Sequence, residues 1–189
     1  PGASNLANFY IGKDPANSVY FPGKIDEARI YNRALSATEI LALYTSNNYT
    51  TLSQKPAESN LVGYWNFNEG TGSFTYDQAG NKNTGMLNGT GGANNLPQFT
   101  IGKYNKALSF DGTDDYVDAG VNSSLDLGTG SATISAWFKT SSNGAILTKR
   151  TGTGFQIYVL AGKFYADGAG TAGVSSANNV ADNVWHHGV

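Results

Sequence analysis

Short strand-like segments separated by turn residues recur along most of this chain and restrict its fold more than any other feature. The segments contain β-branched or aromatic residues, and turns with Gly, Asn, Ser or Asp separate them. The predicted strands are residues 6–12, 19–31, 61–67, 106–110, 115–119, 131–139, 144–149, 154–160, 163–167 and 183–187. Regular short strands with frequent turns predict an all-β fold, an antiparallel β-sandwich or jelly roll.

The composition agrees with this prediction and excludes several kinds of function. Gly accounts for 24 of the 189 residues and aromatic residues for 12% of them, a mixture that argues against a helical protein. The absence of Cys excludes disulfides, zinc-thiolate sites and cysteine nucleophiles. The net charge of -2 gives no reason to expect a nucleic acid as partner, and the sequence contains no apolar run long enough for membrane insertion.

One short helix is predicted at residues 37–44. Ser36 and Glu39 have the spacing of a capping box, in which each residue satisfies a free backbone N–H of the first turn, and Leu35, Ile40 and Leu43 provide apolar positions. The following segment, residues 46–59, is polar, contains a proline and has no periodicity, so it is predicted to be a linker.

Five stretches together resemble the laminin-G-like domains of the concanavalin A-like jelly-roll type, which are common in bacterial surface and secreted proteins. The stretches are "LVGYWNFNEGTGSFTYDQAGNKNTGML" (61–87), "ALSFDGTDDYVDAG" (107–120), "SATISAWFK" (131–139), "DNVWHHGV" (182–189) and "GKIDEARIYNRALSATEILALY" (23–44). The resemblance implies a concanavalin A-like antiparallel sandwich. It also implies a location outside the cell or on its surface, in a bacterium or archaeon.

The order of these stretches differs from that of the family, because the closing motif precedes the opening motif. Residues 1–45 resemble the closing strands and helix, and residues 60–189 resemble the opening and middle strands. The hairpin expected after "WHH" is missing. Three explanations remain open: the chain is an excerpt of a tandem array, a circular permutant, or a unit whose strands complete a neighbouring chain.

Two functions are compatible with these features. The first is a structural or adhesive repeat that assembles with neighbouring copies by strand complementation, and the second is a carbohydrate-binding module that recognises glycans on the concave face of a sheet. Strand alternation places Trp137 and Tyr158 on the more polar faces of their strands, where aromatic rings can stack on sugars. Lys149 is predicted to contact the ligand at the rim.

A structural calcium ion is the cofactor that the resemblance implies, between the opening segment and the closing strand. It would be held by Asp26 and Asp77, with Glu69 as a further ligand, because Ca²⁺ prefers oxygen ligands. Alternation predicts that Asp26 points inward on the same face as Ala28 and Ile30, and a buried carboxylate needs a partner or a cation. The alternative is an Asx turn and a buried hydrogen bond without a metal ion.

Catalysis has little support in the sequence. The two histidines, His186 and His187, are adjacent on a predicted strand, so their side chains point to opposite faces and cannot serve one site. The aspartates of "DGTDDYVD" (111–118) flank a glycine turn, where Asp is an ordinary turn residue. The chain is therefore predicted not to be an enzyme.

Overall fold

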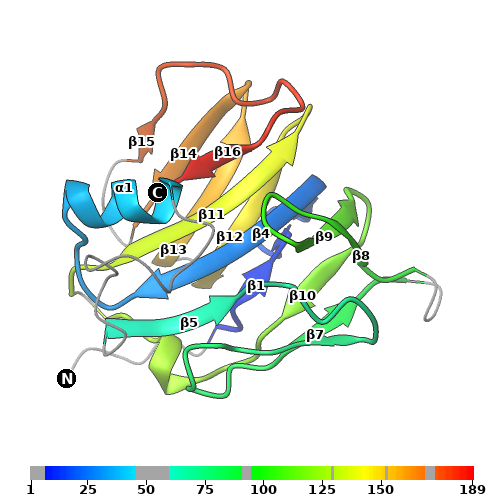
Figure 1. Ribbon diagram of the computed structural model, residues 1–189, viewed down its shortest axis with the longest axis horizontal. Helices are drawn as coiled ribbons and strands as arrows, with labels where there is room; N and C mark the ends of the chain where they lie inside the picture. The colour runs from blue at the N-terminus through cyan, green and yellow to red at the C-terminus, as the bar shows by residue number, and fades with distance from the viewer. Residues whose placement is uncertain (1–6, 46–59, 91–94, 129, 152, 169–172) are drawn as a thin grey trace.

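Two antiparallel sheets stacked on each other dominate the computed structural model of the chain (Figure 1). The structure describes residues 7–45, 60–90, 95–128, 130–151, 153–168 and 173–189. The eight-stranded sheet has the order β15 (Val174–Ser175), β14 (Lys163–Asp167), β13 (Thr153–Leu160), β12 (Gly144–Thr151), β1 (Tyr10–Ile11), β10 (Tyr116–Asp118), β7 (Gly85–Asn88) and β6 (Phe74–Thr75). The six-stranded sheet has the order β16 (His186–Gly188), β11 (Thr133–Thr140), β4 (Pro22–Tyr31), β9 (Lys106–Asp111) and β8 (Gln98–Ile101), with β5 (Leu61–Trp65) also paired to β4.

The remaining elements are small. A two-stranded hairpin of β2 (Lys13–Asp14) and β3 (Val19–Tyr20) packs on β12. Among the described residues there are also one α-helix, α1 (Ala37–Thr45), and a short 3₁₀ helix, η2 (Ser123–Leu125). The prediction of an antiparallel β-sandwich with one short helix is therefore confirmed. The predicted linker, residues 46–59, lies outside the described residues.

Strands from the beginning of the chain lie in the interior of both sheets, which is visible in Figure 1 as blue strands between green and yellow ones. β1 pairs with β10 on one side and with β12 on the other. β4 pairs along one edge with β11, while β9 and β5 share its other edge. Every one of these neighbours comes from residues 60–189, so the two parts of the chain form the sandwich together.

The predicted orientation of Asp26 is wrong, because β4 contains a β-bulge. Ile25 and Ala28 both point into the core although they are three positions apart, an odd number, and Glu27 has a positive φ of 54°. The register with β11 shifts at the same place, since Arg29 pairs with Ser135 but Asp26 pairs with Trp137. The extra residue breaks the strict alternation of the strand. As a result Asp26 lies on the outer face of the six-stranded sheet.

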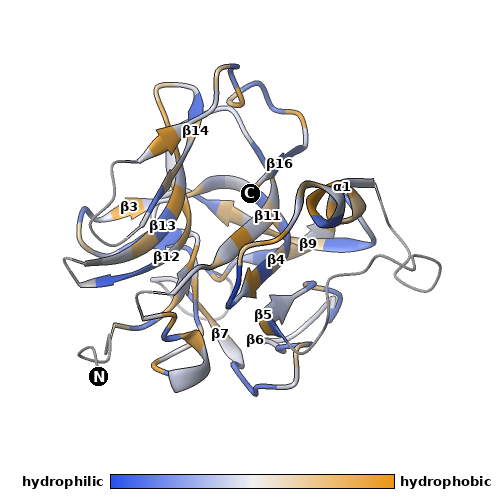
Figure 2. Ribbon diagram, turned by 90° about the vertical axis from the view of Figure 1, so that its left-hand side faces the viewer, coloured by the Kyte–Doolittle hydropathy of each residue, from blue (hydrophilic) through white to orange (hydrophobic). Residues whose placement is uncertain are grey.

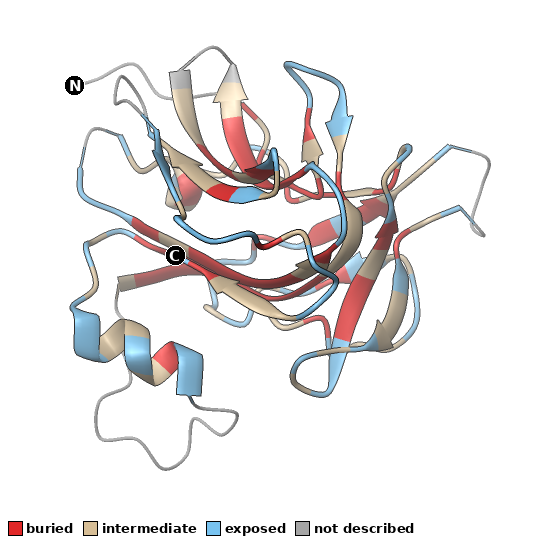
Figure 3. Ribbon diagram, turned by 90° about the horizontal axis from the view of Figure 1, so that it is seen from above, coloured by how far each residue is buried: buried red, intermediate tan, exposed pale blue. Residues whose placement is uncertain are grey.

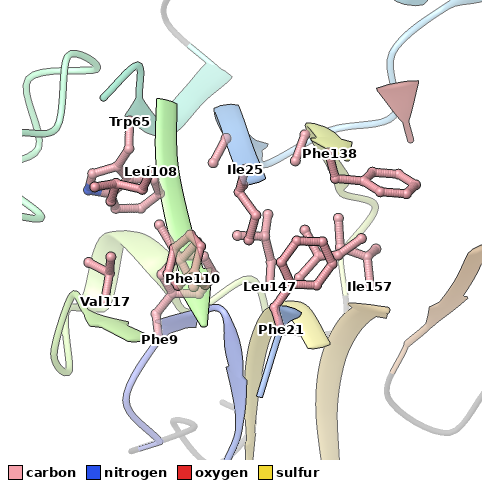
Figure 4. Packing of buried hydrophobic residues seen from close by; sticks show 14 of the residues in the cluster. Phe9, Phe21, Ile25, Trp65, Leu108, Phe110, Val117, Phe138, Leu147 and Ile157 are labelled. Atoms are coloured by element: carbon pink, nitrogen blue, oxygen red, sulfur yellow. The ribbon is translucent and has the colours of Figure 1, made fainter. Parts of the chain in front are cut away.

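The core between the sheets is a single cluster of apolar side chains, of which Figure 4 shows the packing from close by. Phe9 of the N-terminal segment stacks on Trp65, with ring centroids 5.1 Å apart, and Phe138 stacks on Phe164 at 5.7 Å. Hydrophobic and hydrophilic residues are interspersed along the strands (Figure 2), as expected of strands that bury only one face. Full burial of a large apolar side chain contributes about 1.5–3 kcal/mol, so this cluster is the main source of stability.

The predicted capping box is confirmed at the start of α1. The backbone N–H of Ser36 donates to Glu39 Oε2 at 2.8 Å, and the backbone N–H of Glu39 donates to Ser36 Oγ at 3.3 Å. Arg33 adds an ion pair with Glu39 at 2.6 Å. Most of the helix surface is exposed (Figure 3), and Leu43 is its buried residue, packed with Tyr31 and Leu61 on the outer face of the six-stranded sheet.

Several short strands were not predicted. β7 and β8 have four residues each, and β6 and β15 have two, within stretches rich in Gly, Asn and Thr. Their own sequences favour a strand only weakly, and each becomes one by pairing with a neighbouring strand of its sheet. The last strand begins later than predicted, at His186, because Asn183 adopts a positive φ of 61° in the turn before it.

Candidate functional site

The three residues predicted to bind a ligand lie in three different environments. Trp137 lies on the outer face of the six-stranded sheet and is 2% exposed. Tyr158 is half-buried on the outer face of the eight-stranded sheet, because its neighbours Ile157 and Val159 point into the core. Lys149, also in the eight-stranded sheet, is 1% exposed. The structure therefore does not bring these three side chains to one surface.

Trp137 belongs to an aromatic cluster under α1. The Tyr44 ring stacks on it at 5.4 Å between centroids, the His187 ring lies at 5.1 Å, and the edge of Tyr104 approaches it at 5.9 Å. The ammonium of Lys103 lies 4.3 Å from the centroid of the Trp137 ring, a cation–π contact. In this arrangement Trp137 packs α1 and the turn after β8 against the sheet.

Lys149 connects the N-terminal segment to β12. Its ammonium donates a hydrogen bond of 2.6 Å to the backbone oxygen of Ala7. Burial lowers the pKa of Lys149, although the charge of Asp126 acts in the opposite direction. This residue therefore holds the start of the described chain in place.

The carboxylate of Asp77 is fully engaged in hydrogen bonds from the protein. Oδ1 accepts from the backbone N–H groups of Tyr64 at 2.9 Å and Ala79 at 2.8 Å. Oδ2 accepts from the side-chain amide of Asn83 at 2.8 Å and from its backbone N–H at 3.3 Å. These bonds are those of an Asx turn tied to β5, which is the metal-free arrangement that the sequence left open.

Glu69 and Asp26 are also held by protein donors, but at other places. Glu69 Oε1 accepts from Tyr76 N–H at 2.8 Å and from Thr75 Oγ1 at 3.1 Å, while its Oε2 is buried without a hydrogen bond. Asp26 Oδ2 accepts from Tyr104 N–H at 2.9 Å. Within the described residues, Asp26, Asp77 and Glu69 do not form a group whose carboxylate oxygens all lie within 4.8 Å of one another, and a calcium ion bound by them stays a prediction.

The acidic group with such spacing, in the part of the chain that the structure describes, consists of Asp111, Asp114 and Asp115, whose oxygens lie within 4.8 Å of one another. Asp111 Oδ1 accepts from Thr113 N–H at 2.8 Å, from Asp114 N–H at 3.2 Å and from Asp115 N–H at 3.4 Å. In addition, Asp115 Oδ2 accepts a hydrogen bond from the backbone N–H of Asp111 at 3.0 Å. The carboxylates of Asp111 and Asp115 therefore stabilise the turn between β9 and β10, while Asp114 Oδ2 accepts from Thr90 N–H at 2.9 Å.

Asp26 is buried and carries an unusual pKa. Burial, which is the largest cause, and the neighbouring charge of Glu27 raise the pKa of Asp26 to about 7, while backbone N–H donors, chiefly that of Tyr104, act in the opposite direction. A Cβ at Gly102 would lie 2.6 Å from Asp26 Oδ2, so a residue without a side chain is needed there for the turn to reach the carboxylate. Asp26 Oδ1 is buried without a hydrogen bond.

Next to Asp26, the bulge also creates a buried ion pair. Arg29, which is 2% exposed, pairs with Glu27, which is 4% exposed. The hydroxyl of Tyr64 donates to the same carboxylate, at 2.9 Å from Oε2 and 3.1 Å from Oε1. The Arg29 guanidinium also lies 4.1 Å from the centroid of the Tyr64 ring. This network joins β4 to β5, and so joins the two parts of the chain.

The outer face of the eight-stranded sheet carries aromatic residues that the sequence patterns did not single out. Tyr165 is the cross-strand partner of Tyr158, and the two rings stack with centroids 5.2 Å apart and planes 12° apart. Two residues further along the same two strands, the side-chain amide of Gln156 donates a hydrogen bond of 2.9 Å to the carboxylate of Asp167. In "KFYAD" Phe164 points inward and Tyr165 points outward. This alternation could have identified Tyr165 as an aromatic residue on the outer face of the sheet.

A second aromatic group lies further along this face. The ammonium of Lys13 lies 3.8 Å from the centroid of the Tyr116 ring, 5.4 Å from that of Tyr10 and 5.5 Å from that of Tyr20. The rings of Tyr10 and Tyr116 meet edge to face at 5.7 Å. No local pattern predicts this group, because it depends on how the β2–β3 hairpin folds over the sheet.

Polar contacts also connect the N-terminal segment to the rest of the chain. Asn8 donates to the carboxylate of Asp118 at 2.9 Å, on the strand beside β1. Arg150 forms an ion pair with Asp14 at 2.6 Å. Together with the core and the Lys149–Ala7 bond, these contacts define the joint, the name used below for the interface between residues 7–45 and residues 60–189. We take the joint as the candidate functional site.

Comparison with known proteins places the chain in a family. A laminin-G family model, described as "Concanavalin A-like lectin/glucanases superfamily", matches residues 1–41 and 111–189, which is more than half of the sequence. The comparisons with curated proteins and with solved structures gave no match. Among the described residues, no helix is long and apolar enough to cross a membrane. With an antiparallel sandwich as its fold and this match along its sequence, the chain belongs to the laminin-G-like family of the concanavalin A-like superfamily.

Proposed function

We propose that this chain is a non-enzymatic, extracellular structural module that assembles with neighbouring copies by strand complementation. The observation that carries the proposal is the position of the N-terminal segment: β1 is an interior strand of one sheet and β4 is an interior strand of the other. Its apolar side chains, among them Phe9, Phe21 and Ile25, are fully buried in the shared core. The segment therefore acts as a donor that completes both sheets at once.

All contacts of the joint are non-covalent, apart from the chain connection through residues 46–59. The buried ion pair of Arg29 with Glu27 lies within β4, but its partner Tyr64 comes from β5, and the Asp14–Arg150 pair crosses the joint. Identical contacts can form within one copy or between two, because the donor and the acceptor are present in every chain. The balance between the two arrangements depends on protein concentration.

An engineered disulfide across the joint tests this proposal directly. Lys24 of β4 and Lys139 of β11 are cross-strand partners, both half-buried, and the chain contains no cysteine of its own. Cross-strand partners have Cα–Cα distances of about 4.5–5.5 Å, which a disulfide can bridge. After oxidation of Lys24→Cys/Lys139→Cys at increasing protein concentration, we expect covalent dimers and longer ladders on a non-reducing gel.

The matched control places both cysteines within residues 60–189. Gln98 and Ser109 are cross-strand partners in β8 and β9, so Gln98→Cys/Ser109→Cys must close within one chain whichever copy donates the N-terminal segment. This variant should stay monomeric on the gel. A purely monomeric band for Lys24→Cys/Lys139→Cys at every concentration would show that the joint closes only within one copy and would contradict the proposal.

Glycan binding is the second candidate, favoured by the stacked pair Tyr158–Tyr165 beside Gln156 and Asp167. Stacked aromatic rings next to amide and carboxylate groups are suited to sugar rings and hydroxyls. If a glycan array and calorimetry identify a ligand, Tyr158→Ala should weaken its binding roughly tenfold or more. Tyr76→Ala, which alters a tyrosine that is 54% exposed and follows β6 at the opposite edge of the same sheet, should not. Equal affinities for the two variants would exclude this face as the site.

A further inference from the structure

β4 has one residue more than its pairing with β11 requires. Ile25 pairs with Phe138 and Ile30 pairs with Ile134, so five positions on β4 lie opposite four positions on β11. Glu27, with its positive φ, is the extra residue of this bulge. Without it Ile25 and Ile30 would be an even number of positions apart, and both would face the core from a regular strand. Packing of the core therefore does not explain why β4 contains Glu27.

Glu27 is unfavourable for the fold in two ways. Its positive φ is a conformation that residues other than glycine rarely adopt. Its carboxylate and the guanidinium of Arg29 are buried, and the attraction between two buried charges often fails to offset the free energy of removing them from water. A strained residue at a buried polar site is therefore expected to serve a purpose other than packing.

Both members of this ion pair belong to the donor segment, the name used here for residues 7–45. Arg29 pairs with the Glu27 carboxylate and also donates a hydrogen bond of 3.0 Å to the backbone oxygen of Glu27. A bulge leaves the backbone of its extra residue outside the ladder of the sheet, and here Arg29 satisfies that carbonyl. The two charges therefore travel with β4 into whichever copy accepts the segment.

Tyr64 is the residue of the acceptor, residues 60–189, that contacts both charges. It lies on β5, which runs beside β4 (Figure 1). Its hydroxyl donates to the Glu27 carboxylate, and its ring lies under the Arg29 guanidinium at 4.1 Å from the centroid. Its backbone N–H donates to Asp77 at 2.9 Å, so the tyrosine is fixed from the side of the acceptor. One side chain thus contacts an anion and a cation of the donor segment.

We infer that Tyr64 makes β5 a recognition site for one kind of strand, a bulged strand that carries a Glu and an Arg two residues apart. The inference rests on the proposed strand complementation and specifies its partner, residues 22–31 of another copy of this chain. A strand without the pair would leave the Tyr64 hydroxyl without its acceptor, and a strand with only one of the charges would bury that charge uncompensated. Selection of a partner and a register is the best-attested use of such buried polar groups.

The test uses two 189-residue chains with one cysteine each, Lys24→Cys in the first and Lys139→Cys in the second. The two cysteines become cross-strand partners only when the first chain inserts its donor segment into the second chain. In a glutathione buffer the disulfide forms reversibly, so the amount of disulfide-linked heterodimer reports the exchange equilibrium. Glu27→Gln and Tyr64→Phe are then added to this pair of chains in two arrangements.

In the split arrangement, Glu27→Gln is placed in the Lys24→Cys chain and Tyr64→Phe in the Lys139→Cys chain. A heterodimer in which each chain donates to the other then brings the two altered residues together and restores the native contact in the second joint. Its equilibrium constant should rise roughly fivefold, because a hydrogen bond to a charged group is regained.

In the combined arrangement, both substitutions are placed in the Lys24→Cys chain. The heterodimer then sets each altered residue against a native one, so its equilibrium constant should fall roughly fivefold. The same substitutions are present in both arrangements, so their effects on the stability of the fold are equal. Only a preference between Glu27 and Tyr64 can separate the two results.

A second variant and a matched control complete the design. Deletion of Glu27 together with Arg29→Met removes both charges and leaves the alternation of β4 regular, and with Tyr64→Phe it should give the same opposite changes. Asp14→Asn with Tyr64→Phe is the control, because Asp14 pairs with Arg150 on the other sheet. Its split and combined arrangements should give equal amounts of heterodimer.

The inference and the proposed function fail in different ways. Equal amounts of heterodimer in the split and combined arrangements, for both the Glu27→Gln and the deletion variant, would overturn the recognition by Tyr64 and leave strand complementation standing. If the two chains that carry only Lys24→Cys and Lys139→Cys form no heterodimer at any concentration, strand complementation is wrong and the inference is wrong with it.

Discussion

Removal of residues 1–45 is expected to abolish cooperative folding, so that residues 60–189 aggregate or stay unfolded. The deletion takes away β1, between β10 and β12, and β4, between β11 and its partners β9 and β5. Each sheet is then divided and presents new unpaired edges, and the core loses buried side chains such as Phe9 and Ile30. Circular dichroism during thermal unfolding and size-exclusion chromatography measure the effect.

The control restores the deleted part as a separate chain. Coexpression of residues 1–45 with residues 60–189 should recover a soluble complex that unfolds cooperatively, because the contacts of the joint do not require the connection through residues 46–59. A fragment of residues 60–189 that folds cooperatively by itself would disprove the interior role of β1 and β4 and would also weaken the proposed function.

Replacement of Asp26 by Asn is expected to change how stability depends on pH. The folded-state pKa of Asp26 is raised from 3.8 to about 7. The folded protein therefore holds a proton that the unfolded chain releases near pH 4, and the stability that this proton provides is lost as the pH rises through 7. Asn is neutral at every pH, so Asp26→Asn should become more stable than the wild type by about 2–4 kcal/mol at pH 8, at about 1.4 kcal/mol per pKa unit.

Urea unfolding at several pH values measures this difference. At each pH, the free energy of unfolding of the wild type is subtracted from that of Asp26→Asn. The change in this difference from pH 4 to pH 8 tests the prediction, because any effect of the amide that does not depend on pH cancels. His187, whose lowered pKa of about 4 makes stability rise with pH up to its unfolded value, is present in both proteins and cancels as well. If the difference in free energy of unfolding between the two proteins is the same from pH 4 to pH 8, Asp26 is ionised in the folded protein and the prediction is wrong.

Local signals were reliable where neighbouring residues decide the structure. Ser36 and Glu39 lie three positions apart and form the reciprocal hydrogen bonds of a capping box, because both partners belong to the same turn of helix. Alternation in β11 correctly separated Ala136 and Phe138, which are in the core, from Trp137. The resemblance to laminin-G-like domains added the fold family, which the family match confirms.

The candidate sites were less predictable, because they depend on contacts between distant segments. The orientation of Asp26 was wrong because a single extra residue in β4 reverses the faces of the strand, and alternation contains no signal for a bulge. Tyr158 and Trp137 both point away from the core, as alternation predicts, but they lie on the outer faces of different sheets, and Trp137 is buried there under α1. Asp77 and Glu69 lie in one glycine-rich stretch, yet each carboxylate is held by its own set of donors.

The fold class, the helix, the longer strands and the family could be predicted from the amino-acid sequence, because periodicity, capping and motifs act over a few residues. The positions of β1 and β4 inside the two sheets, and the hydrogen bond from Lys149 to Ala7, depend on contacts between distant segments. Segments more than a hundred residues apart pair because the pairing buries a common hydrophobic core. Residues from all parts of the chain contribute to this core, so no local stretch of sequence predicts the pairing.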